Sequence, residues 1–142
     1  MGDSERGRGR LRWALLGWAS FTTGCAEELG PPARETTRVS GVVREGSTAV
    51  GGGWIEFLPT LGTVGNMRSA PIDRNGRFEA KGVAVGLNRI GFTGAPIKIP
   101  GWRRYFDPLR SEVVRPIPPG RTDNLTIDLY AELARATKSA IP

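Results

Sequence analysis

The stretch IDRNGRF at residues 72–78 decides the fold prediction, because it sets an Asn-Gly pair between two short runs of strand-forming residues. Asn-Gly readily supplies the positive φ angles of a tight β-hairpin loop, and it is a strong short-range hairpin signal when strand patterns flank it. The stretch therefore predicts a hairpin between a strand ending at Ile72 and a strand beginning at Arg77.

Similar short runs continue along the chain on both sides of this turn, separated by Gly, Pro and Asn. Alternation places Ile55 and Phe57 inward with Trp54 half buried, and it gives a strand at 125–130 with one buried face. No long segment with a helical period competes. The predicted strands are 39–44, 54–58, 67–72, 77–80, 87–93, 112–115 and 125–130.

These runs predict an all-β fold, one seven-stranded antiparallel sandwich over residues 38–130. The remaining tail, 131–142, is expected to form one or two helical turns or to fray. A chain of 142 residues has room for one domain of this size behind a targeting segment.

Composition narrows the possible chemistry. The chain has no His and a single Cys, so the usual Ser-His-Asp triad, the common zinc ligand sets and an intrachain disulfide are excluded. We therefore expect no enzyme activity, no cofactor and no metal. The net charge is +6, but four Arg residues lie within the first 12 positions, and from Cys25 onward 16 basic face 12 acidic residues, leaving +4. Nucleic acid is consequently not the favoured partner.

The N-terminus has the layout of a secretory signal. Residues 1–12 are polar and Arg-rich, 13–21 are apolar, and small residues lead to Cys25. The apolar run is too short to span a bilayer as a helix. Its end resembles a bacterial lipobox, with Thr22 where Leu is preferred, which predicts a signal at 1–24 and lipidation of Cys25. An ordinary cleaved signal near Ala19, giving a secreted or periplasmic protein, is the alternative. Residues 25–37 are expected to form a flexible tether.

The order of three motifs resembles a known domain. VSGVV at 39–43, GGWIEF at 52–57 and DRNGRF at 73–78, followed by IPGWRRYFD at 99–107, are similar to the carboxypeptidase regulatory-like, transthyretin-like sandwich found in short planctomycete-type lipoproteins. The resemblance implies a Greek-key sandwich, export and anchoring at the cell envelope, and no catalytic activity. It implies no particular ligand.

One cluster is a candidate binding site, namely Trp102, Arg103, Arg104 and Tyr105, followed by Phe106. Aromatic rings and guanidinium groups in this arrangement stack on sugars and hold anionic groups. The alternative is that the rings cover an open end of the sandwich while the Arg residues are simply solvated. The segment 102–110 follows Pro and Gly, so it is expected to be a surface connection and not a paired strand.

Two functions follow as expectations. The first is a non-catalytic envelope module, held at a membrane by its lipid, that engages an envelope protein or polysaccharide. The second is a binding module for anionic polysaccharide or nucleic acid that acts through residues 102–110.

Overall fold

The computed structural model describes residues 34–139, so the predicted signal, Cys25 and most of the predicted tether lie outside the described residues. Ten elements follow one another along this part of the chain. They are β1 (Thr36–Glu45), β2 (Thr48–Ala49), β3 (Trp54–Pro59), β4 (Arg68–Pro71), β5 (Arg77–Ala84), β6 (Gly86–Thr93), α1 (Trp102–Phe106), β7 (Val114–Ile117), β8 (Thr122–Asp128) and α2 (Leu129–Ser139).

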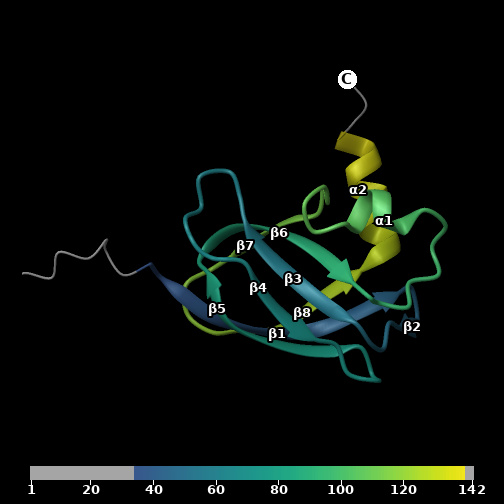
Figure 1. Ribbon diagram of the computed structural model, residues 1–142, viewed down its shortest axis with the longest axis horizontal. Helices are drawn as coiled ribbons and strands as arrows, with labels where there is room; N and C mark the ends of the chain where they lie inside the picture. Colours follow the sequence, from purple (N-terminus) through teal and green to yellow (C-terminus); the bar gives the residue numbers. More distant parts are fainter. Residues whose placement is uncertain (1–33, 140–142) are drawn as a thin grey trace, which may run out of the picture. The chain divides into compact units, whose positions relative to one another are not determined.

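The strands form two sheets, as Figure 1 shows. In the first sheet β1 lies at the centre and pairs with β2, β5 and β8. In the second sheet the order is β4-β3-β6-β7, and all neighbours are antiparallel. The all-β class predicted from the sequence is therefore confirmed, and two sheets of short strands carry it.

Alternating residues of both sheets meet in one core. Val39 and Val43 of β1 are buried, as are Ile55 and Phe57 of β3. The Phe57 ring lies 5.9 Å from the ring of Phe78 on β5, centroid to centroid, so side chains of the two sheets touch. The predicted inward face of 54–58 is confirmed, and Trp54 on the other face is 48% exposed.

The predicted antiparallel arrangement is wrong for one pair, because β8 runs parallel to β1. The register of this pair shifts between Val39 and Gly41, which lie opposite Thr122 and Leu125. β8 thus carries one extra residue there, and Asn124 takes up the bulge with a φ of 64°. Asn adopts this left-handed conformation more readily than other residues with a side chain, which explains its place at the bulge.

The turn at 72–78 does not close a hairpin, contrary to the sequence-based prediction. It connects β4 of one sheet to β5 of the other. Only Gly76 has a positive φ, and the Asp73 carboxylate accepts hydrogen bonds from the amides of Asn75 and Arg77, both at 2.8 Å. An Asp side chain that satisfies its own turn in this way lets the chain change sheets while Ile72 and Phe78 stay buried.

Several predicted boundaries shift. β1 begins at Thr36, inside the stretch expected to be a tether, because the Val85 amide donates to the Glu35 carbonyl and extends the pairing. The strand predicted at 112–115 lies at 114–117. The strand predicted at 125–130 begins at Thr122 and ends at Asp128, whose carboxylate accepts from the Tyr130 amide as the chain turns into α2.

The C-terminal segment forms a longer helix than the one or two turns expected. α2 spans Leu129–Ser139, with Leu129 fully buried and Leu133 packed against the core. In the part of the chain that the structure describes, no helix is long and apolar enough to cross a membrane.

Candidate functional site

The predicted binding cluster forms the short helix α1, which begins after Gly101 and ends at Phe106. A helix places residues three and four apart on one face. Trp102, Tyr105 and Phe106 therefore share the inner face. Phe106 is fully buried and its ring meets Phe92 edge-on at 6.0 Å, while Trp102 and Tyr105 are partly buried against the core. Packing thus accounts for all three rings.

The two arginines of the cluster lie on the outer face of α1, and both are exposed. The Arg103 guanidinium lies 5.6 Å from the centre of the Trp102 ring, within the range of a cation–π contact. Within residues 34–139 neither guanidinium makes a hydrogen bond or an ion pair. The helix therefore presents two exposed cations on its outer face.

A second candidate lies on the outer face of the first sheet, where an open groove of about 930 Å³ crosses β1, β5 and β8. Its lining is mainly polar. The side chains that matter for binding are Ser40, Arg44, Asn75, Arg77, Asn124 and Thr126.

Strand pairing builds this groove. Val42 of β1 lies opposite Arg77 on one side and opposite Thr126 on the other. Arg44 follows on β1, beyond the buried Val43, so it shares the outer face with Val42. Three neighbouring strands thus contribute a hydroxyl and two guanidinium groups to one surface.

The groove carries a net positive charge, because Arg44 and Arg77 line it against a single acid, Asp73. The Asp73 carboxylate bonds to the amides of its own turn. Asp123, next to the lining residue Asn124, accepts from Arg121 at 2.7 Å and from Ser40 at 2.9 Å, and these hydrogen bonds lower the pKa of its carboxyl. Arg44 and Arg77 have no ion-pair partner among the described residues. The two free guanidinium groups can therefore bind an anion.

Sequence reasoning missed the groove, although a signal for it existed. In the sequence, Ser40, Val42 and Arg44 alternate with Val39, Gly41 and Val43, and a strand places such alternate residues on one face. Thr126 could not be assigned to this face, because the parallel pairing of β8 and its bulge were not predicted. Arg77 could not be assigned either, because the turn before it was predicted as a hairpin and β5 pairs with β1 instead.

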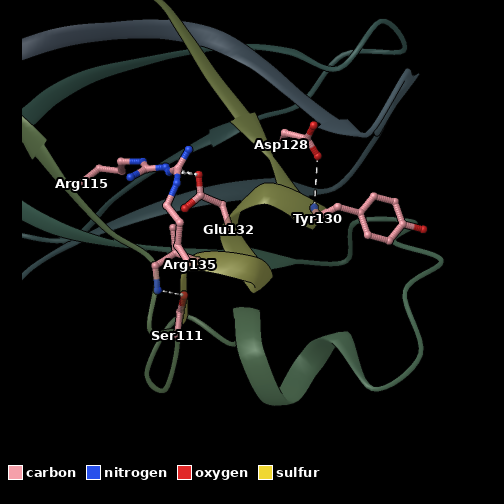
Figure 2. A network of polar contacts seen from close by, with 7 residues as sticks. Ser111, Arg115, Asp128, Tyr130, Glu132 and Arg135 are labelled. Carbon is pink, nitrogen blue, oxygen red and sulfur yellow. Dashed lines mark hydrogen bonds and ion pairs between the residues drawn. The ribbon is translucent and has the colours of Figure 1, made fainter. Parts of the chain in front are cut away.

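A charge network around the buried Glu132 of α2, drawn in Figure 2, joins α2 to β7. The Glu132 carboxylate is only 4% exposed and accepts hydrogen bonds from Arg115 and, at 3.0 Å, from Arg135. Burial raises the pKa of Glu132 by removing water from its charged form, although Arg115 acts in the opposite direction. The network fixes α2 to the second sheet, and both of its cations are engaged.

The carboxylates in loops are engaged by the protein itself, because Asp73 binds the amides of its own turn and Asp123 accepts from Ser40 and Arg121. Among residues 34–139 no group of three or more His, Cys, Asp or Glu side chains is placed to hold a metal ion.

Comparison with known proteins adds no relative, because no protein-family model, curated protein or solved structure matches the chain.

Proposed function

We propose that the protein is an exported envelope lipoprotein that binds a polymer of its surroundings and catalyses no reaction. The N-terminal layout and the lipobox-like end at Cys25 support anchoring at a membrane. The start of β1 at Thr36 leaves a short stretch of chain between the lipid and the domain. A secreted or periplasmic location, after ordinary cleavage, is the alternative.

The fold is assigned as a Greek-key sandwich of the transthyretin-like kind. In support, β2 has two residues and extends the hairpin from β1, which leaves seven longer strands in two sheets. The turn at 72–78 carries the chain from one sheet to the other, as Greek-key connections do.

The binding function is assigned to the groove, and the partner to an acidic polysaccharide. One observation carries this proposal, namely that Arg44 and Arg77 line the groove without an ion-pair partner among the described residues. Guanidinium groups bind carboxylates and sulfates through two parallel hydrogen bonds. The hydroxyl and amide groups beside them suit the hydroxyl groups of a sugar chain.

The test is retention of the protein on polygalacturonate and on dextran sulfate, with neutral dextran as the reference. The double variant Arg44→Gln and Arg77→Gln should lose most of its retention on both acidic polymers. A control, Lys98→Gln with Lys138→Gln, removes the same charge at two exposed positions away from the groove and should bind nearly as the wild type does. If both double variants lose retention equally, the groove contributes only to the overall positive charge of the protein and is not a specific binding site.

A second candidate is binding of the same polymers through α1. It is favoured by the exposure of both Arg103 and Arg104 on a helix that Phe106 holds in the core. The groove remains the stronger candidate, because its two guanidinium groups lie beside several polar side chains.

A further inference from the structure

The loop between β3 and β4, residues 60–67, exposes three large apolar side chains. Leu61 is 74% exposed, Val64 62% and Met67 49%. Single exposed apolar residues are normal on a protein surface, but a group of them on one loop marks a contact site.

The backbone at the tip of the loop is strained. Leu61 has a φ of 50° and Gly62 a φ of 88°, and the Thr63 amide donates to the Thr60 carbonyl at 3.0 Å. Gly, Asn and Asp suit the first central position of such a turn, whereas a bulky Leu is disfavoured there. Because the Leu61 side chain is mostly exposed, burial within the domain does not compensate for this strain.

The base of the loop is firmly held. The Thr63 hydroxyl accepts from the Leu87 amide at 2.7 Å, and the Thr60 amide donates to the Leu87 carbonyl at 3.0 Å. Gly65 lies so close to β5 that a Cβ on it would come within 2.5 Å of the Ala84 methyl. The apolar side chains therefore project from a fixed platform.

This platform lies at the end of the domain where the chain enters. The Val85 amide donates to the Glu35 carbonyl, which places residue 35 beside the β5–β6 turn that holds the loop. Figure 1 shows the loop on the same side as the start of β1. The ten residues between Cys25 and Thr36 span at most roughly 35 Å when extended, so a lipid on Cys25 keeps this end of the domain close to the bilayer.

Basic residues lie near the base of the loop. Arg34 and Lys81 are exposed, and Arg68 follows Met67 directly and donates from Nε to the Gly82 carbonyl at 3.1 Å. Cations next to exposed apolar side chains are the pattern of surfaces that bind the interface of anionic bilayers.

We propose that the 60–67 loop is a membrane-contacting tip, which inserts Leu61, Val64 and Met67 into the headgroup region of the bilayer. Arg34, Arg68 and Lys81 face anionic headgroups. The role in the cell rests on the lipid anchor of the proposed function, but the contact itself needs no anchor. Its consequence is orientation, because a domain held by both a tether and a tip keeps its far end turned away from the membrane.

Fluorescence tests the contact directly. Cys25 is the only cysteine, so the full chain with Cys25→Ser accepts one new cysteine for an environment-sensitive dye. The dye at Leu61→Cys, or at Val64→Cys as a second position, should shift to shorter wavelength with vesicles of equal parts phosphatidylcholine and phosphatidylglycerol. The dye at Leu109→Cys, a residue 72% exposed elsewhere, should not shift.

Equal shifts at all positions, or none at 61 and 64, would overturn the proposal. If the dye at 61 shifts with envelope protein in the absence of lipid but never with vesicles, the loop binds a protein partner and not the bilayer. These results are independent of the anchor, because all proteins in the comparison lack Cys25. An unlipidated Cys25 in the wild-type protein, shown by mass spectrometry of its N-terminus, would contradict the proposed function alone.

Substitution supplies a second test with two readouts. In the same background, Leu61→Asn should raise the melting temperature, because Asn tolerates the positive φ, and should lower the vesicle-bound fraction several-fold. The control Leu109→Asn should change neither quantity. A Leu61→Asn variant that is more stable and binds vesicles as well as its parent would show that the exposed leucine has no part in membrane contact.

Discussion

Gly41 of β1 faces the backbone of Leu125 on β8 so closely that a Cβ on Gly41 would come 2.0 Å from the Leu125 carbonyl oxygen. No side chain fits there without a shift of the strand, and the obstacle is backbone, which cannot rotate away. Gly41 therefore makes the parallel pairing of the first and last strands possible.

We expect Gly41→Ala to lower the free energy of unfolding by about 2 kcal/mol or more, because the added methyl must push β8 away from β1. Urea denaturation followed by far-ultraviolet circular dichroism measures the change. The control Thr126→Ala, an exposed position on the same strand pair, should stay within about 0.5 kcal/mol of the wild type. An unchanged midpoint for Gly41→Ala would contradict the close approach of these strands.

The buried Glu132 predicts a difference in pH dependence. Its pKa is raised in the folded protein, so the folded state binds this proton more tightly than the unfolded chain does. The contribution of Glu132 to stability is then fully present below the ordinary Glu pKa and is lost as pH rises through the raised value.

The stability of the wild type relative to Glu132→Gln should therefore increase as pH falls from 7 to 4, because Gln cannot titrate. Urea midpoints of both proteins across this range measure the difference, and the other titrating groups cancel. A difference that shrinks on acidification would mean that Arg115 and Arg135 dominate over burial and that the pKa of Glu132 is lowered.

Replacing Arg103 and Arg104 of α1 by Ala should leave stability within about 1 kcal/mol, because both side chains are exposed. We expect this variant to keep its retention on polygalacturonate and the Arg44→Gln and Arg77→Gln variant to lose it. The opposite result would make α1 the binding surface. As a packing control, Phe106→Ala should destabilise the fold by about 3 kcal/mol or more, because it empties a fully buried site.

Lipidation of Cys25 stays a prediction from sequence, and fractionation tests it. Cys25→Ser should move the protein from the membrane to the soluble fraction of a bacterial host, since stable anchoring requires more than one acyl chain and the variant can carry none on this residue. Mass spectrometry of the wild-type N-terminus is the direct measurement. An unmodified Cys25, or cleavage near Ala19, would favour the secreted or periplasmic alternative.

Local patterns predicted the strands but not their partners. Alternation at 54–58 identified Ile55 and Phe57 as buried, because a strand facing one core repeats every two residues. The partner of β5 could not be found in this way, since the turn at 72–78 has the residues of a hairpin and yet changes sheets. The sequence left open whether Trp102, Tyr105 and Phe106 cover the sandwich or bind a ligand, and the single helical turn of α1 packs all three against the core.

The pairing of β1 with β8 also governs when the domain can finish folding. Ser40 and Asp123 are hydrogen-bonded across 83 positions of sequence, so the central strand lacks one neighbour until nearly the whole chain has been synthesised. Contacts between such distant segments form slowly, because a long loop must close before they contribute any stability. A nascent chain that ends before β8 leaves one edge of β1 unpaired. An export translocase can still thread such a chain in extended form.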